Sequence, residues 1–238
     1  MKILKQKHKQ VLVFLNKIKD YIFPVFCLGC KKEGEWLCDK CFEKIDLSGI
    51  FDCPVCHKNT EFGVCCLPCG GESFLDKHLA VTKYEEDGLV GSVIQTLKYS
   101  WAEDVLSAID KIISKFVDEN RDLFMNIDCV VPVPLHQKRY VERGFNQAEL
   151  IAKILADKIN KPLKNILTRQ RHTSQQAKLG REERLENLKD AFVIKKVVRG
   201  NILLVDDVFT TGSTIQECAK VLKNSGVDKV VGFSLARG

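Results

Sequence analysis

Apolar and polar positions alternate in two ways over the last two thirds of the chain. Short apolar runs typical of strands lie at 79–84, 127–134, 163–167, 191–194, 202–208 and 229–235. Between these runs, apolar residues recur at helical spacing, as they do at Val90, Val93 and Leu97. Because a helix carries the chain back between two parallel strands, this alternation favours a parallel sheet. The pattern predicts an α/β fold, a doubly wound parallel sheet with helices on both faces.

The first 22 residues follow a different pattern. One stripe of a helix would carry Leu4, Val11, Leu15, Ile18 and Ile22. Six lysines against one aspartate give this segment a charge of +5. We expect an amphipathic helix over residues 1–22 that ends at Pro24. We expect this helix to pack on the protein itself or on a partner. Binding to a membrane surface is the alternative for a basic amphipathic segment.

Cysteines are concentrated in one part of the sequence. Of the eleven, nine lie between Cys27 and Cys69. Eight of these form four C-x2-C knuckles: Cys27 and Cys30, Cys38 and Cys41, Cys53 and Cys56, Cys66 and Cys69. Two knuckles bring four thiolates to one point, which suits structural Zn2+ better than redox chemistry. The spacing predicts a double zinc-ribbon module at 23–75, ahead of a domain at 76–238. Two points stay open: whether Cys65 or Cys66 is a ligand, and whether there are one or two zinc ions.

Composition adds limits on the class of protein. A hydrophobic content of 45% suits a packed core, and the net charge of +6 is moderate. Lysines interrupt the N-terminal apolar positions, so we expect neither a secretory signal nor an integral membrane segment. We therefore expect a cytoplasmic protein whose cysteines stay reduced.

The stretch from Asn201 to Cys218 carries the clearest chemistry. An apolar run leads into two carboxylates, Asp206 and Asp207. A turn of hydroxyls and one glycine follows, made of Thr210, Thr211, Gly212, Ser213 and Thr214. Such a turn at a helix N-terminus binds anions, but it lacks the lysine of a Walker A loop. The carboxylates suit ribose hydroxyls. The stretch predicts a site for a ribose with one 5′-phosphate, with an acidic cap on an ordinary helix as the alternative.

Val205–Thr214 resembles the phosphoribosyl pyrophosphate (PRPP) motif of the type I phosphoribosyltransferases. Two polar, cation-rich segments, 132–147 and 167–188, are expected to face the same crevice. Long polar loops in a compact domain are usually binding loops or lids. We expect both to clamp a phosphate-bearing ligand, and a solvated basic surface is the alternative.

From Phe23 onward, the sequence is similar to the ComF family, in which a cysteine-rich zinc module precedes a type I phosphoribosyltransferase domain. Besides the knuckles, the resemblance rests on Leu97–Tyr99, Val131–Pro134, Arg139, Arg143–Gln147, Arg171, Thr173, Gln176, Arg184, Asn187 and Val205–Thr214. It implies a role in natural transformation, handling single-stranded DNA at the cytoplasmic side, with a competence helicase as a further partner.

The resemblance also implies roles for single residues. Asp206 and Asp207 are expected to hold the ribose hydroxyls, and the Thr210–Thr214 turn the 5′-phosphate. Lys98, Arg139 and Arg143 are expected at the pyrophosphate, with Mg2+ bound through PRPP oxygens. The expected catalytic residues are the two aspartates and Arg143, as a nitrogen nucleophile attacks C1′ and pyrophosphate leaves.

Two classes of function stay open at this point. One is a phosphoribosyltransferase enzyme, including one of nucleotide salvage, although no acceptor-base pocket is recognisable. The other is a PRPP-binding protein that works on DNA. The loop from Arg169 to Arg184 carries five cations against two acids, and aromatics such as Trp36 or Phe62 could stack on bases. We expect weak, sequence-independent binding of single-stranded DNA by this loop and the zinc module.

Overall fold

The computed structural model describes residues 24–99, 103–171 and 190–238. The chain forms two compact units that divide between Lys44 and Ile45. The helix expected at 1–22 lies outside the described residues. The predicted boundaries at 23–75 and 76–238 stay predictions. The third and fourth knuckles belong to the same compact unit as the sheet.

The first unit is built around the first two knuckles. Its helix α2 (Asp39–Phe42) starts directly after Cys38, and Phe26 pairs with Glu33 in a single antiparallel bridge. Among its described residues, the buried hydrophobic side chains are those of Cys27, Leu37, Cys38 and Cys41. Three of these four are cysteines of the knuckles. A unit with so small an apolar core needs a further source of stability, which metal ligation by the two knuckles would supply.

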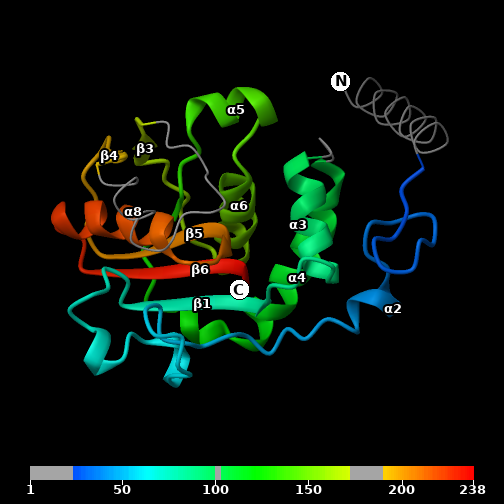
Figure 1. Ribbon diagram of the computed structural model, residues 1–238, viewed down its shortest axis with the longest axis horizontal. Helices are drawn as coiled ribbons and strands as arrows, with labels where there is room; N and C mark the ends of the chain where they lie inside the picture. Colours follow the sequence, from blue (N-terminus) through cyan, green and yellow to red (C-terminus); the bar gives the residue numbers. More distant parts are fainter. Residues whose placement is uncertain (1–23, 100–102, 172–189) are drawn as a thin grey trace, which may run out of the picture. The chain divides into compact units, whose positions relative to one another are not determined.

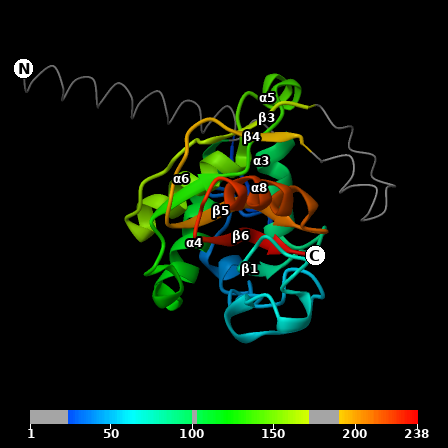
Figure 2. The ribbon, with the colours of Figure 1, turned by 90° about the vertical axis from the view of Figure 1, so that its left-hand side faces the viewer.

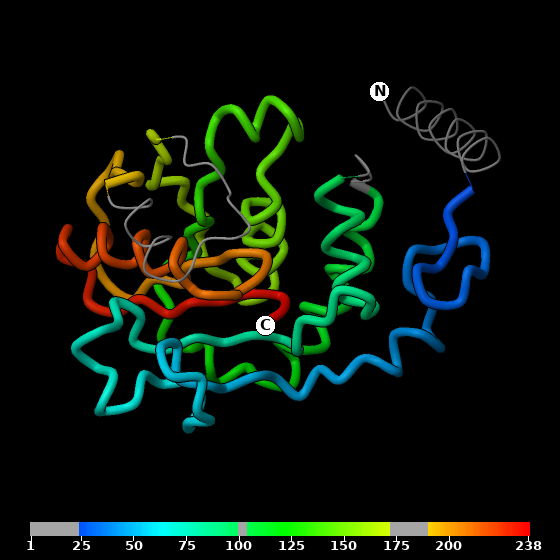
Figure 3. The backbone as a smooth tube through the Cα atoms, viewed as in Figure 1, coloured from blue at the N-terminus to red at the C-terminus, as the bar shows by residue number. Residues whose placement is uncertain are grey.

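Four parallel strands form the sheet of the second unit, in the order β1-β6-β5-β2 (Figure 1). They are β1 (Lys77–Lys83), β2 (Cys129–Pro132), β5 (Asn201–Phe209) and β6 (Lys229–Arg237). Val205 of β5 lies opposite Pro132 on one side and Phe233 on the other. The C-terminus follows β6 and lies beside the end of β1 (Figure 3). The prediction of a parallel α/β sheet is confirmed, and β5 lies in its interior.

Helices cover both faces of this sheet (Figures 1 and 2). They are α3 (Leu89–Tyr99), α4 (Leu106–Glu119), α6 (Gln147–Ile159) and α8 (Ser213–Asn224). On one face, Ile215 of α8 joins a buried cluster that includes Leu204 of β5. On the other face, the rings of Phe116 of α4 and Phe233 of β6 lie 6.1 Å apart, and α6 packs against α4. Successive residues of β5 therefore point into different layers.

Two of the predicted strand runs do not join the main sheet. β3 (Leu167–Arg169) and β4 (Phe192–Ile194) pair with each other in an antiparallel ladder. The prediction that these runs continue the parallel alternation was wrong. Near the edge of β2, Leu163 makes only one bridge, to Val130. The neighbouring Pro162 has no N–H to donate, so the ladder cannot extend through it.

A helix lies within the segment 132–147, which the sequence presents as a polar binding loop. α5 (Gln137–Arg143) begins after His136, whose Nδ1 accepts a hydrogen bond from the N–H of Lys138 at 3.1 Å. No residue of α5 is buried. Without an apolar stripe, helical periodicity could not reveal it.

The remaining helical elements are short 3-10 turns at Glu61–Gly63, Leu67–Cys69, Glu103–Val105 and Arg121–Phe124. Among the residues described, none of the helices has the length and apolar character needed to cross a membrane.

Candidate functional site

Four sulfur atoms converge in the first unit. They belong to Cys27, Cys30, Cys38 and Cys41, and all lie within 4.8 Å of one another. The sulfurs of Cys30 and Cys38 are 3.6 Å apart. A disulfide would require about 2.05 Å. Four sulfurs placed about 2.3 Å from a tetrahedral Zn2+ lie about 3.8 Å apart, so the spacing fits a zinc site.

A second group of four sulfurs lies in the second unit. Its members are Cys53, Cys56, Cys66 and Cys69, again within 4.8 Å of one another, with Cys56 and Cys66 sulfurs 3.7 Å apart. Cys65 is not part of the group, and its backbone N–H donates to the carbonyl of Asp76 at 2.9 Å. The structure thus places Cys66, and not Cys65, in the four-cysteine cluster. The two four-cysteine clusters can each hold one metal ion.

The first knuckle of each cluster has the same backbone geometry. In both, the first cysteine donates its N–H to a carbonyl five residues on, and the residue four positions on donates back. The bonds are Cys27 to Lys32 (2.8 Å) and Lys31 to Cys27 (2.9 Å), matched by Cys53 to Lys58 (2.8 Å) and His57 to Cys53 (3.2 Å). Lys31 and His57 also share a positive φ, 61° and 60°. The repeated geometry shows that each knuckle is closed by its own backbone.

The first cysteine of each cluster is prepared for ionisation. Burial opposes the charge on Cys27, but N–H groups of Cys38, Cys30 and Gly29 donate to its sulfur and lower the pKa of the thiol to about 6. Burial is likewise outweighed at Cys53, where backbone donors bring the pKa to about 6. A thiolate near neutral pH is the form that binds zinc. Elsewhere in the clusters, burial raises the pKa of Cys41 and hydrogen bonding with Cys66 raises that of Cys69, each to about 12, so the fit to Zn2+ rests on the sulfur distances and on the first cysteine of each cluster.

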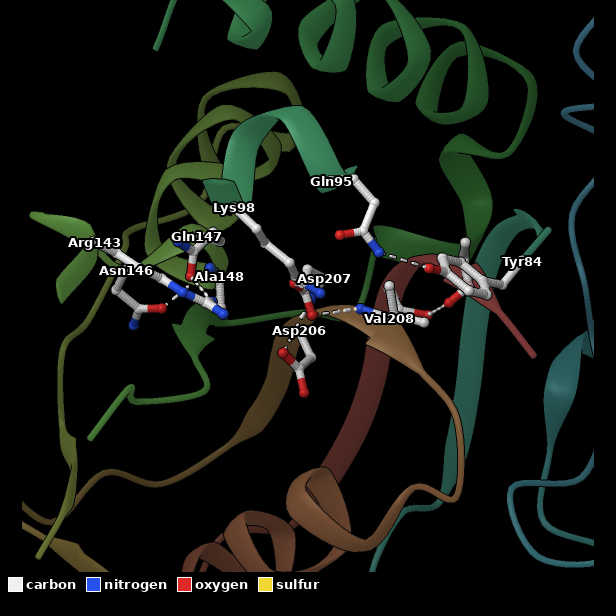
Figure 4. Close-up of polar contacts among 12 residues, drawn as sticks. Tyr84, Gln95, Lys98, Arg143, Asn146, Gln147, Ala148, Asp206, Asp207 and Val208 are labelled. Carbon is white, nitrogen blue, oxygen red and sulfur yellow. Dashed lines mark hydrogen bonds and ion pairs between the residues drawn. The ribbon is translucent and has the colours of Figure 1, made fainter. Parts of the chain in front are cut away.

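The two carboxylates at the end of β5 point to opposite faces of the sheet (Figure 4). Asp207 points toward α3, where its Oδ2 lies 2.6 Å from the Nζ of Lys98 (Figure 4). Asp206 continues the side of β5 that carries Leu204 and faces α8. Local backbone bonds orient both, because Asp207 N–H donates to Asp206 Oδ1 at 2.9 Å and Val208 N–H to Asp207 Oδ1 at 2.8 Å.

Asp206 sits among groups that change its ionisation. Burial and the charge of Asp207 raise the pKa of Asp206 to about 8. Arg169 of β3 lies near enough that the negative charge of Asp206 partly offsets the lowering of the Arg169 pKa by burial. The β3–β4 pair therefore brings a cation to this carboxylate. From the sequence, Arg169 was predicted only as part of a basic loop. Apolar spacing does not reveal that β3 pairs with β4 and so does not place Arg169 near Asp206.

The predicted phosphate turn lies between β5 and α8. Gly212 has φ 72° and precedes the first residue of α8. The hydroxyls of Thr211 and Ser213 lie 3.0 Å apart. Among the described residues, no backbone carbonyl accepts from the N–H of Thr210, Thr211 or Gly212. N–H groups of this kind at the N-terminus of a helix of 12 residues are suited to binding an anion. We call Thr210–Thr214 the phosphate cradle.

The segment Arg143–Gln147 joins α5 to α6 beside the carboxylates (Figure 4). Arg143 donates to Gln147 Oε1 at 3.0 Å, and its guanidinium lies 5.3 Å from the ring centre of Tyr99. Asn146 caps α6 by accepting from the N–H of Ala148 at 3.2 Å, and it donates to the carbonyl of Val133 at 3.0 Å. Gln147 is 3% exposed, and its Nε2 has no partner among the described groups.

The predicted site residues are brought together only in part. Lys98, Asp206, Asp207 and the cradle lie at one end of β5, with Lys98 bonded to Asp207. Arg143 is held by Gln147 instead. Arg139 lies on α5, and its charge lowers the pKa of Arg169 after the larger effect of burial. Thr173, Gln176, Arg184 and Asn187 lie outside the described residues.

Sequence reasoning missed two residues that support the cradle, Phe209 and Arg237. Both are buried, and the guanidinium of Arg237 lies 4.6 Å from the ring centre of Phe209. A signal for Arg237 was present, since it ends an apolar strand on which a charge is out of place.

The chain is similar to known proteins over most of its length. The family model for the phosphoribosyl transferase domain matches residues 142–235, which include the carboxylates and the cradle. Competence protein F of Haemophilus influenzae is 30% identical over 234 residues, covering 90% of this chain and 98% of that protein. DNA utilization protein YhgH of Escherichia coli K12 is 30% identical, covering 90% and 97%. Competence protein ComFC of Streptococcus pneumoniae is 31% identical, covering 84% and 86%.

Proposed function

The chain belongs to the ComF family, and we propose that it binds PRPP together with Mg2+ at the C-terminal end of β5. The observation that carries the proposal is the position of Asp206 and Asp207 directly before the phosphate cradle, at the interior of a parallel sheet. In sheets of this class, ligands bind at the carboxyl ends of the strands. A ribose 5-phosphate unit needs carboxylates and a phosphate cradle a few residues apart, which β5 and α8 provide.

Each part of the site has one task in this proposal. The N–H groups and hydroxyls of Thr210–Thr214 bind the 5′-phosphate. Asp206 and Asp207 accept hydrogen bonds from the ribose hydroxyls. Carboxylate and phosphate oxygens are ligands that Mg2+ prefers, and the bound ion neutralises the charge of the pyrophosphate group. Arg143 and Arg139, carried by α5, meet the same charge from the protein side.

Lys98 changes partner when the ligand enters. Its ammonium lies 2.6 Å from Asp207, and both side chains are largely shielded, with 19% and 15% exposed. A ribose hydroxyl at Asp207 competes for the same carboxylate, while pyrophosphate offers Lys98 a stronger negative charge. In the proposal, Lys98 therefore leaves Asp207 for the pyrophosphate. The ion pair between Lys98 and Asp207 is then present only without ligand, and contacts with the ligand replace it.

The same residues support transfer chemistry. A transferase breaks the C1′–O bond of PRPP, releases pyrophosphate with the bonding electrons, and forms a C1′–N bond to the acceptor. Positive charge fixed at Lys98, Arg139 and Arg143 stabilises the departing pyrophosphate. The alternative within the proposal is a PRPP sensor that makes no covalent change.

A role with single-stranded DNA is the second part of the proposal. The names of the relatives, competence protein and DNA utilization protein, support it. Phe62 is 52% exposed and so is accessible for stacking, whereas Trp36 is only partly exposed. We propose that the protein works on incoming DNA in the cytoplasm, with PRPP as ligand or substrate and a competence helicase as a further partner.

Calorimetric titration with PRPP and Mg2+ tests the first part. Asp207→Asn is expected to weaken binding about tenfold or more, because hydrogen bonds to charged groups contribute about 1.5–3 kcal/mol. Asp206→Asn is expected to do the same above about pH 8, where the Asp206 carboxyl is ionised. Asp118→Asn is the matched control, since Asp118 is an exposed carboxylate paired with Arg121. Unchanged affinity in the double variant would place the ligand elsewhere.

Pyrophosphate release separates the enzyme from the sensor. It is measured from PRPP and Mg2+ alone, with single-stranded DNA, and with a panel of nitrogen bases. Release that depends on one acceptor identifies a transferase of that acceptor. Tight PRPP binding without release under any condition identifies a sensor.

A further inference from the structure

A buried arginine links the second four-cysteine cluster to the sheet. Arg237 lies at the end of β6 and is 3% exposed. Its Nη1 donates to the carbonyl of Asp52 at 2.9 Å, and its Nη2 donates to the carbonyl of Cys53 at 2.7 Å. Cys53 is the first ligand of the second cluster. The planar fork of the guanidinium therefore holds the backbone at the start of that metal site.

The same guanidinium lies over the ring of Phe209, the last residue of β5. The distance from Arg237 Cζ to the ring centre is 4.6 Å, which is within the range of a cation–π contact. His78 packs on the same ring with centroids 4.1 Å apart, and its Nδ1 lies 3.5 Å from Arg237 Nη1. Phe209 is 2% exposed. Its ring is thus positioned by two neighbours, one of which holds the metal site.

Phe209 in turn positions the phosphate cradle. A Cβ atom on Gly212 would lie 2.5 Å from Cζ of the Phe209 ring, so the turn and the ring are already in contact. Close packing of this kind transmits displacement because no void absorbs it. If the ring moves, the N–H groups of the turn lose the support that aims them at a ligand.

A second connection reaches the helix that follows the cradle. Gln216 of α8 accepts from the N–H of Phe74 at 2.9 Å and donates to Ser73 Oγ at 2.9 Å. Ser73 and Phe74 follow Cys69, the last ligand of the cluster, by a few residues. The first turns of α8 are therefore tied to the segment that leaves the metal site. Both connections lie within the unit Ile45–Gly238.

We propose that the Cys53–Cys69 cluster, acting through Arg237 and Phe209, sets the position of the phosphate cradle, so that zinc in this cluster controls its affinity for a phosphorylated ribose. Arg237 and Phe209 are positioning residues and do not touch the ligand. The inference rests on the proposed phosphate site. The first cluster, in the other compact unit, has no such part in the proposal.

Hydrogen exchange in the full-length, zinc-loaded protein tests the connection without any ligand. Arg237→Met keeps all eight ligand cysteines and removes both bonds to the knuckle. We expect the amide of Gln216, which donates to the carbonyl of Gly212 at 2.9 Å, to exchange about tenfold faster, as for loss of a charged hydrogen bond, while zinc content stays at two per chain. Arg237→Lys keeps the charge but not the planar fork, so we expect its exchange rate to lie between those of the wild type and Arg237→Met. Arg121→Met, at an exposed arginine, is the control.

Zinc removal gives a second measurement on a protein with no change near the cradle. The double variant Cys27→Ser, Cys30→Ser is expected to keep one zinc ion, in the second cluster. Stripping that ion with a chelator should accelerate exchange at the amide of Gln216 and weaken ribose 5-phosphate binding about tenfold in calorimetry. Before stripping, both properties should equal those of the wild type.

The outcomes separate this inference from the proposed function. A lower melting temperature with unchanged exchange at Gln216 in Arg237→Met, or unchanged exchange at Gln216 after stripping, overturns the inference and leaves Arg237 a stability residue. If the wild type binds neither ribose 5-phosphate nor PRPP, the proposed function fails, while the exchange results still decide whether the metal site positions the turn.

Discussion

The two four-cysteine clusters use the same ligands in the same knuckle geometry, yet their surroundings differ. Around the first, the described backbone bonds of the knuckles close within the unit, as in the bond from the N–H of Leu28 to the carbonyl of Trp36 at 2.9 Å. Around the second, the carbonyl of Cys53 is bonded to a buried arginine of β6. The motif alone therefore does not define the role of a zinc site; the partners of its backbone groups do.

Burial sharpens the difference. Three cysteines of the first cluster are buried and supply most of the small core of their unit, whereas in the second cluster only Cys53 is buried. The first cluster replaces a hydrophobic core. The second lies beside an existing core and connects to it through Arg237 and Gln216.

The largest expected effect compares the loss of each metal ion. Structural zinc contributes on the order of 10 kcal/mol, which is comparable with the whole stability of a domain. We expect Cys53→Ser with Cys56→Ser to lower or abolish the main calorimetric transition. Cys27→Ser with Cys30→Ser should leave that transition near its wild-type temperature. Metal analysis should give two zinc ions in the wild type and one in each variant. Equal shifts of the main transition in both variants would contradict the comparison.

Alanine substitutions at two glycines test whether the Phe209 ring beside the phosphate cradle can move aside. Gly212 and Gly226 both have positive φ, 72° and 93°, so alanine costs about 1 kcal/mol or more of backbone strain at either. At Gly212 the new Cβ also meets Phe209 at 2.5 Å, while at Gly226 nothing lies within 4 Å. Overpacking adds about 1–3 kcal/mol. Denaturant unfolding should therefore rank Gly212→Ala as the more destabilising, and similar values would show that Phe209 is not held in place.

The sequence predicted the parts of the fold that hydrophobic spacing encodes. The stripe at Val90, Val93 and Leu97 is buried along α3 as expected, and the run from 202 to 208 is an interior strand. α5 was missed, because a helix with no buried residue leaves no periodic signal. The runs near 167 and 192 were assigned to the wrong sheet, since spacing identifies a strand but not its partner.

The candidate site was predictable in its motif and not in its pairing. Spacing predicted the eight cysteines that converge in two groups. The motif placed Asp206, Asp207 and the turn at the end of an interior strand, and their roles as a ligand site stay predictions. The ion pair between Lys98 and Asp207 could not be anticipated, because it joins residues more than 100 positions apart. The same holds for Arg237 and Cys53, whose bond depends on where β6 ends.

Asp206, near the end of β5, makes the free energy of unfolding of the second unit depend on pH. Its pKa, raised by burial and by Asp207 to about 8, exceeds the ordinary value of 3.8. Between these values the folded state holds a proton that the unfolded state has released. The stability that Asp206 contributes is therefore fully present below about pH 4 and is lost as pH rises to about 8. The slope from this group is at most about 1.4 kcal/mol per pH unit.

Unfolding of wild type and Asp206→Asn from pH 5 to 8 measures this contribution. We expect the variant to lose the slope and to gain stability relative to the wild type as pH rises. Asp206 belongs to the second unit, so a variant lacking the zinc of the first unit should keep the wild-type slope. A slope unchanged by Asp206→Asn would assign the pH dependence to another group.

The smallest expected effect concerns charge beside the two clusters. Residues 24–44 hold four lysines and four acidic residues, whereas residues 45–76 hold one lysine and five acidic residues. If single-stranded DNA reaches the zinc modules, its phosphates should favour the first, where Lys31 and Lys32 are both exposed, over Lys58 beside the second. Each contact with a phosphate of single-stranded DNA contributes about 0.7 to the slope of log affinity against log salt. In a salt titration of a labelled oligonucleotide, Lys31→Gln with Lys32→Gln should therefore reduce the slope by up to about 1.4, and Lys58→Gln should leave it unchanged. A larger change from Lys58→Gln would reverse the assignment and place DNA beside the cluster that supports the phosphate cradle.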